Sequence, residues 1–174
     1  MYSHPQKYID IDIYGTCGSP CPGDLCHNDS PMTDYRFYLS FENSFCTDYI
    51  TEKFFKQFYR DRTVVPVVRG GGDYDRYFDP GTFINAAHFR DPRSLALYLK
   101  KLSGDQDAYF AVLERKMRYV QLWQNYQLRW RTDFHCSVCE LLNKRRPEVR
   151  SYYDVVEWAQ DKRCWPAPDD RPKT

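Results

Sequence analysis

Residues 35–53 contain the sequence feature that most limits how this chain can fold. The segment Tyr35–Phe41 is aromatic and aliphatic with almost no charge, which is the composition of a strand buried on both faces. A polar Glu-Asn-Ser turn at positions 42–44 ends it. Asp48 is placed to cap a helix, whose apolar residues recur every four positions: Ile50, Phe54 and Phe58. The stretch therefore predicts a strand, a turn and a helix that packs on a sheet.

The polar face of this helix carries a candidate anion site. Tyr49, Glu52 and Lys53 stand at i, i+3 and i+4, so their side chains are expected on the first turn, away from the apolar stripe. A helix N-terminus after a strand offers unpaired backbone N–H groups and a positive dipole end, and Lys53 adds a full charge. The same spacing also fits an ordinary surface helix, with a contact between Lys53 and Tyr49 and a solvated Glu52. Spacing alone leaves both interpretations open.

Further strands and helices are expected along the chain. The alternation and β-branched runs predict strands at residues 8–14, 63–68 and 82–87. Three glycines at positions 70–72 follow the second of these, either for close approach of a ligand to the backbone or as a flexible connector. Asp91 and Pro92 open a helix as N-cap and first residue. Its buried stripe is predicted to consist of Leu95, Tyr98, Leu99 and Leu102.

The C-terminal third of the chain is mainly helical in composition. A long helix is expected over residues 105–131, with aromatic residues at spacings of three and four. These residues favour packing over a sugar platform: Tyr119, Trp123, Tyr126 and Trp130. A short helix is expected at residues 152–159, and residues 166–174 form a polar, proline-rich tail.

The charge balance argues against one class of partner. Twenty-five Lys and Arg against 24 Asp and Glu give a net charge of +1, so broad electrostatic binding of nucleic acid is not expected. Aromatic residues make up 17% of the chain, more than a small core needs, and such residues also line sugar and base sites. No segment approaches the ~20 apolar residues of a membrane-spanning helix.

The cysteines indicate an oxidising compartment. There are seven in 174 residues, and the odd number leaves at least one thiol free or paired outside the chain. Cys17, Cys21 and Cys26 lie in a loop rich in Gly and Pro, while Cys136 and Cys139 form a Cys-x-x-Cys pair. Zinc binding by these five is the alternative, but the first three lack the paired spacing of zinc ligands. A glycosylation sequon at positions 28–30 is consistent with the secretory route.

Several motifs in order resemble those of the α1,3-fucosyltransferase family. They are Phe-Glu-Asn-Ser at positions 41–44, Asp-Tyr-Ile-Thr-Glu-Lys at 48–53, and Val-Pro-Val-Val at 65–68 followed by Gly70. The resemblance continues upstream at positions 11–18 and downstream at 80–99, and it covers roughly residues 8 to 140. Members of this family are inverting enzymes of GT-B type that use GDP-fucose. The resemblance therefore implies an α/β fold, the Rossmann-like C-terminal domain of a GT-B glycosyltransferase.

The resemblance also implies roles for individual residues. Lys53, Tyr49 and the helix N-terminus would stabilise the charge that develops on the diphosphate of GDP. Glu52 would accept hydrogen bonds from ribose or fucose hydroxyls, and Asn43 would orient the donor or the nearby backbone. No catalytic residue is expected in this chain, because the family's base is a carboxylate of an N-terminal domain. Neither Asp-x-Asp motif, at positions 10–12 or 73–75, suits a metal site, so no cofactor and no divalent metal is required by the sequence.

Three regions and one cellular setting follow as expectations. Residues 1–34 form a first strand and a Cys-rich loop, residues 35–145 a GDP-fucose-binding core, and residues 146–174 a C-terminal helix and tail. By resemblance the chain is the C-terminal part of a Golgi type II membrane protein, with a luminal catalytic domain, a membrane anchor further upstream, and disulfides from the late Cys-x-x-Cys to segments outside this chain. The acceptor is a GlcNAc-containing glycan of a glycoprotein, either the N-glycan core or a terminal lactosamine. The alternative is a secreted, disulfide-linked module that binds glycans or proteins without catalysis.

Overall fold

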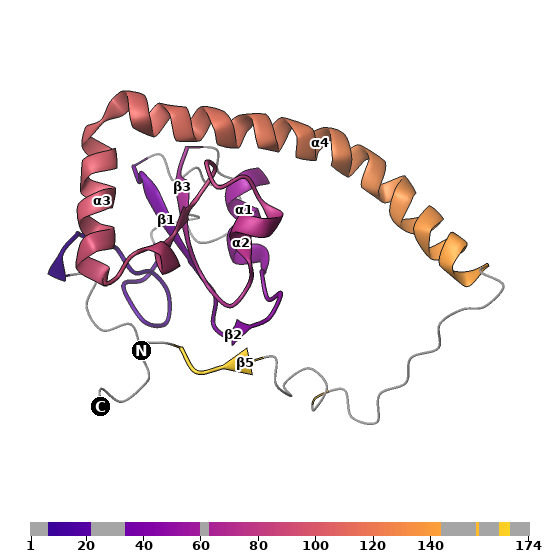
Figure 1. Ribbon diagram of the computed structural model, residues 1–174, viewed down its shortest axis with the longest axis horizontal. Helices are drawn as coiled ribbons and strands as arrows, with labels where there is room; N and C mark the ends of the chain where they lie inside the picture. Colours follow the sequence, from indigo (N-terminus) through magenta and orange to yellow (C-terminus); the bar gives the residue numbers. More distant parts are fainter. Residues whose placement is uncertain (1–6, 22–33, 60–62, 144–155, 157–163, 168–174) are drawn as a thin grey trace.

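A parallel sheet forms the centre of the protein in the computed structural model (Figure 1). The structure describes residues 7–21, 34–59, 63–143, 156 and 164–167, with the side chains of 59, 119–134 and 137 left out of the description. Strands β1 (Phe37–Phe41), β3 (Val65–Arg69) and β4 (Ile84–Asn85) lie in the order β1-β3-β4. Both pairings are parallel, with Leu39 opposite Val67 and Val67 opposite Ile84. The carboxyl ends of all three strands therefore share one edge.

The central strand β3 packs against helices on both of its faces. Val68 joins an aromatic cluster on the side of helix α1 (Glu52–Tyr59), where the ring of Phe54 lies 4.8 Å from that of Phe58 and 5.4 Å from that of Tyr74. Val65 and Val67 alternate with Val68 and face the other cluster, which includes residues of helices α3 and α4: Leu99, Leu102 and Tyr109. Residues 65, 67 and 68 are fully buried. This two-sided burial is the pattern of a parallel strand in an α/β protein.

Helices α3 (Pro92–Gly104) and α4 (Gln106–Leu142) form the second layer (Figure 1). Asp91 caps α3 with Pro92 in the first turn, as predicted. Leu99 and Leu102 are buried and Leu95 packs against the same cluster, but Tyr98 is 42% exposed, so its predicted burial is wrong. Its ring lies on the surface 5.2 Å from that of Phe89, because position 98 falls at the margin of the apolar stripe. Ala96 is buried instead.

Helix α4 begins after its own cap at Asp105 and continues well beyond the sheet (Figure 1). Near its start Lys116 is fully buried, with Nζ donating to the carbonyl of Val64 at 2.5 Å and lying 5.8 Å from the ring of Phe58. The predicted aromatic stripe at positions 119–130 lies on this helix, but its side chains are outside the description. Across the part of the chain that is described, none of the helices combines the length and apolarity needed to cross a membrane.

Three predicted strands differ from the structure. The first predicted segment, residues 8–14, contains no strand: only Tyr14 makes an isolated bridge, to Ser19, and Ile13 is 43% exposed. Tyr35 instead donates to Asp12 at 2.8 Å, so the alternation reflects side-chain contacts rather than a sheet partner. Strand β1 is buried only at Ser40, because it lies at the edge of the described sheet. The predicted strand at residues 82–87 shortens to β4 and turns into a 3₁₀ helix (Ala86–His88), whose start Asn85 caps.

A second, two-stranded sheet ties the C-terminal region to the core. Strand β2 (Phe45–Cys46) pairs antiparallel with β5 (Cys164–Trp165), and Cys46 and Cys164 form a disulfide. The sequence alone did not indicate that these two cysteines pair. Cys136 and Cys139, which form the Cys-x-x-Cys motif, are exposed and unbridged within this chain. The predicted helix at 152–159 lies outside the described residues except for Val156, as does the tail beyond residue 167.

Candidate functional site

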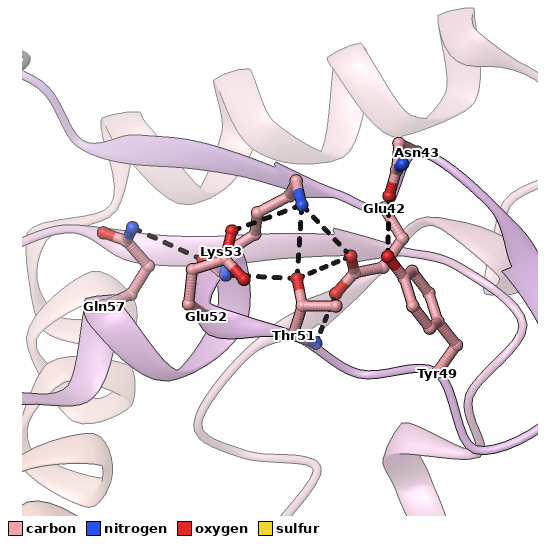
Figure 2. Close-up of polar contacts among 7 residues, drawn as sticks. All are labelled: Glu42, Asn43, Tyr49, Thr51, Glu52, Lys53 and Gln57. Carbon is pink, nitrogen blue, oxygen red and sulfur yellow. Dashed lines mark hydrogen bonds and ion pairs between the residues drawn. The ribbon is translucent and has the colours of Figure 1, made fainter.

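The candidate site lies at the carboxyl edge of the sheet, between the end of β1 and the start of α1 (Figure 2). In open α/β sheets this edge is where ligands usually bind. The chain leaves β1 at Phe41, forms β2 and returns to enter α1 at Glu52. Two polar groups, an interior one around Glu42 and an outer one around Tyr49, occupy this connection.

Glu42 is the interior group, and it is only 1% exposed. Its carboxylate accepts the backbone N–H of Thr51 at 2.7 Å through Oε1 and the Thr51 hydroxyl at 2.8 Å through Oε2. A buried carboxylate is tolerated only when such donors replace its water. Glu42 therefore fixes the residue that directly precedes α1.

The helix start predicted at Asp48 is wrong. Helix α1 begins at Glu52, and Asp48 has a left-handed backbone with φ of 58°. The carboxylate of Asp48 accepts the hydroxyl of Tyr77, at the end of the short helix α2 (Tyr74–Tyr77), at 3.2 Å. Because Glu42 binds the Thr51 N–H and hydroxyl, the helix start is held by the residue that directly follows β1 rather than by a local cap.

Lys53 carries the positive charge of the site. Its Nζ donates to the hydroxyl of Thr51 at 3.2 Å and forms ion pairs with Glu52 at 3.4 Å and Glu42 at 3.6 Å (Figure 2). Burial lowers the pKa of Lys53, but the Glu42 and Glu52 carboxylates more than offset this, so the pKa lies above its ordinary value. Lys53 is therefore an ammonium at neutral pH, and its side chain keeps 34% exposure toward solvent.

Glu52, Tyr49 and Asn43 are the remaining residues of the site. The backbone N–H of Glu52 lowers the pKa of its own carboxyl, burial opposes this, and Lys53 lowers it further, so the group is ionised at neutral pH. Tyr49 precedes the helix rather than lying on its first turn, and its hydroxyl donates to Oδ1 of Asn43 at 3.0 Å, not to Lys53. The four residues named from the sequence form two bonded pairs, Asn43 with Tyr49 and Glu52 with Lys53, and Figure 2 shows Glu42 and Thr51 between them.

Sequence reasoning missed Glu42 and Thr51 as site residues. Glu42 was placed in the turn that ends β1 and in the Phe-Glu-Asn-Ser motif, but neither gave it a role, and no periodic pattern shows that it bonds nine residues ahead. One signal was present: an acidic residue directly after a largely apolar strand is a candidate for a buried, paired carboxylate.

The glycines after β3 pack against this group. A Cβ on Gly70 would lie 2.9 Å from Cγ of Glu42 and 3.1 Å from the Tyr74 hydroxyl. A Cβ on Gly71 would meet the backbone N and O of Cys46, each at 2.5 Å. The end of β3 is therefore glycine because the protein's own backbone and Glu42 occupy the space. These close contacts do not fit the flexible connector that was one of the two sequence-based interpretations.

A second polar cluster lies where β4 ends. The Asp75 carboxylate accepts Nδ2 of Asn85 at 2.9 Å and lies 3.0 Å from Nε2 of His88. It was not predicted, because its members come from α2, β4 and the following 3₁₀ helix. Among the described residues no cluster of three or more His, Cys, Asp or Glu side chains forms a metal-binding group.

A parallel sheet with a fixed ammonium and a helix start at its carboxyl edge is the arrangement of α/β proteins that bind phosphorylated ligands. The profile of the C-terminal part of glycosyltransferase family 10, the fucosyltransferases, matches residues 1–158. The chain therefore belongs to glycosyltransferase family 10.

Individual relatives agree with this assignment. The chain is 37% identical over 157 residues to Alpha-(1,3)-fucosyltransferase C of Drosophila melanogaster, with 88% of this chain and 35% of that protein covered. It is also 37% identical over 169 residues to Glycoprotein 3-alpha-L-fucosyltransferase A of the same species, covering 91% and 31%. A 4-galactosyl-N-acetylglucosaminide 3-alpha-L-fucosyltransferase of Pongo pygmaeus is 34% identical over 161 residues, covering 90% and 42%. The chain thus spans about a third to two fifths of the length of these relatives.

Proposed function

We propose that this chain is the donor-binding part of an α1,3-fucosyltransferase, a Rossmann-like domain of a GT-B enzyme that transfers fucose with inversion from GDP-fucose to GlcNAc of a glycoprotein glycan. The observation that carries the proposal is the Lys53 ammonium, held at the start of α1 on the carboxyl edge of the sheet. The match to family 10 over residues 1–158 supports the donor. The names of the relatives support the linkage and the acceptor.

Lys53 acts on the leaving group in this proposal. As the bond between fucose C1 and the phosphate oxygen breaks, GDP departs with the electron pair and negative charge grows on its diphosphate. The ammonium and the positive end of α1 are in place before this charge forms, so little reorganisation is needed. A charged hydrogen bond of this kind contributes about 1.5–3 kcal/mol. In this proposal Lys53 is the group of this chain that neutralises the charge, and the sequence does not require a divalent metal.

The other residues orient the donor. The ionised Glu52 carboxylate, exposed over 56% of its side chain, accepts hydrogen bonds from ribose or fucose hydroxyls. Asn43 and Tyr49, already bonded to one another, form a pair whose remaining donors and acceptors contact the donor sugar or phosphate. The acceptor hydroxyl forms the new bond to C1 and gives its proton to a carboxylate base, which we place in a part of the enzyme outside this chain.

The cellular setting belongs to the same proposal. The Cys46–Cys164 disulfide supports folding in an oxidising compartment. We place the protein in the Golgi lumen, joined to the membrane through a segment outside the described residues. Its partners there are GDP-fucose and glycoprotein acceptors.

Calorimetric titration of GDP into the oxidised chain tests the donor site. GDP is expected to bind saturably and more tightly than GMP, which lacks the second phosphate. Lys53→Ala is expected to raise the Kd for GDP by roughly 10- to 100-fold, as loss of a charged hydrogen bond predicts. Lys56→Ala removes the same charge one turn further along α1 and should leave the Kd within about twofold. A folded chain that binds GDP equally well with and without Lys53 would reject this donor site.

A further inference from the structure

We propose that Glu42 and Thr51 form a positioning pair, which holds the Lys53 ammonium in the orientation that meets the diphosphate. The inference rests on the proposed donor site and assigns a role to two residues that lie in the resembling motifs but had been given none. Neither residue needs to touch the donor, because both act through Lys53.

The Thr51 hydroxyl connects the two charges. It accepts from Nζ of Lys53 at 3.2 Å and donates to Oε2 of Glu42 at 2.8 Å, so one oxygen links ammonium to carboxylate. A single hydroxyl oxygen can accept and donate at once, which no one atom of a methyl group or a side-chain amide can. The second oxygen of Glu42 holds the Thr51 N–H at 2.7 Å, which fixes the backbone from which the hydroxyl projects.

Glu42 rather than Glu52 sets the position of Lys53. Glu52 lies nearer to Nζ, at 3.4 Å against 3.6 Å, but its side chain is 56% exposed. An exposed pair of this kind contributes little, because water competes and both side chains move. The Glu42 carboxylate is buried, accepts two hydrogen bonds from Thr51, and is confined by Gly70. It is the fixed end of the network.

Fixing a lysine in advance has a clear benefit for binding. A lysine side chain has four rotatable bonds and loses rotamer entropy when it is immobilised. If the Glu42 and Thr51 pair has already restricted Lys53, the ligand meets a prepared cation and less entropy is lost on binding. The restriction is partial, since a third of the Lys53 side chain still faces solvent.

A competing effect has the opposite sign. The Glu42 charge lowers the local positive potential and could itself compete with phosphate for the ammonium. Glu42→Gln separates these effects, because it removes the charge at nearly constant shape. The amide oxygen can still accept the Thr51 N–H, but its NH₂ group then faces Lys53 and Thr51 as a donor. Positioning predicts weaker GDP binding in this variant, whereas competition predicts tighter binding.

A double-mutant cycle on the oxidised full chain tests the inference. Glu42→Gln is expected to raise the Kd for GDP about tenfold alone, but less than about twofold when combined with Lys53→Ala, because it acts through Lys53. Thr51→Val should weaken GDP binding in the same way. Thr51→Ser, which keeps the hydroxyl, should bind GDP as the wild type does. An equal effect of Glu42→Gln in both backgrounds would show a merely structural role and overturn the inference. Tighter binding by Glu42→Gln would overturn it as well.

A second readout does not depend on GDP. Trace labelling with acetic anhydride measures the reactivity of each lysine amine, with Lys56 as the internal reference. Burial lowers the pKa of Lys53 and Glu42 helps to raise it, so Glu42→Gln should increase Lys53 labelling severalfold at pH 8. Unchanged labelling would overturn the inference. Equal GDP affinity of wild type and Lys53→Ala would instead reject the donor site, and the labelling would still decide whether Glu42 holds Lys53.

Discussion

The two helices α1 and α3 pack on the same sheet but are started in different ways. At α3, Asp91 accepts the N–H of Ser94 at 2.7 Å and Ser94 bonds back to the N–H of Asp91 at 3.3 Å, within four residues of chain. At α1, Thr51 is held by Glu42 from the end of β1. The local cap stabilises one helix only. The distant carboxylate joins a strand to a helix and also fixes a lysine, so its loss should affect both stability and binding.

Replacing Glu42 and Asp91 in turn is expected to give the largest difference in the free energy of unfolding. Glu42→Ala should lower the free energy of unfolding by about 2–4 kcal/mol, because it leaves the Thr51 N–H without its acceptor and opens a cavity beside Gly70. Asp91→Ala should cost less, since the exposed start of α3 can be hydrated. Urea unfolding of both variants under oxidising conditions measures the two values. If Asp91→Ala proves the more damaging, the distinction between the two helix starts fails.

Substitutions at two glycines are expected to change the stability by an intermediate amount. Gly70→Ala would press a Cβ to 2.9 Å from Glu42 and is expected to destabilise the protein by about 1–3 kcal/mol. Gly104→Ala, at the end of α3, meets nothing within 4 Å and should stabilise the helix by up to about 1 kcal/mol. Thermal unfolding of the two variants should therefore shift in opposite directions. A Gly70→Ala variant as stable as wild type would mean that Glu42 is not confined as described.

The smallest expected effect is the acid response of the α3 cap. The N–H of Ser94 lowers the pKa of Asp91, burial opposes this and Arg90 adds to the lowering. A carboxyl with a lowered folded pKa stabilises above its unfolded value, about 3.9, and loses that contribution as pH falls through the folded value. Asp91→Asn keeps a capping side chain but does not titrate, so the advantage of wild type should be present at pH 7 and shrink below about pH 4.

Urea midpoints at pH 7 and pH 3 measure this response, with Glu114→Gln as a control for an exposed carboxylate on α4. The Asp91 difference should shrink in acid while the control changes little. An advantage that grows as pH falls would contradict the sign of the shift.

The difference between the two helix starts also explains which features could be predicted from the sequence alone. The start of α3 was predicted correctly because the whole signal, Asp91, Pro92 and the following apolar period, is local. The start of α1 was wrongly predicted at Asp48. The helix start is held through Thr51 by Glu42, which lies nine positions upstream of Thr51 and directly follows β1. The apolar stripe of Ile50, Phe54 and Phe58 was correct, since burial against the sheet follows helical period even where the helix start does not.

Other misses share that cause. The alternation at residues 8–14 predicts a strand, but a strand needs a partner, and the tyrosines bond to one another and to Asp12 instead. Strands β2 and β5 contain two residues each, too few for any period, and their disulfide joins positions 118 residues apart. Tyr49, Glu52 and Lys53 were indicated by their spacing and by family resemblance, and Asn43 by resemblance alone. The contact between Glu42 and Thr51 became visible only in the fold.

Nuclear magnetic resonance of the ¹⁵N-labelled, oxidised chain during titration with GDP tests whether the donor binds at the start of α1. The largest amide shifts are expected at residues 51–53, while the amides of residues 93–95 at the start of α3 should stay in place. Shifts at residues 93–95 as large as those at 51–53, or saturating GDP that moves neither helix start in a folded chain, would contradict the assignment of the donor site to Lys53 and its supporting pair.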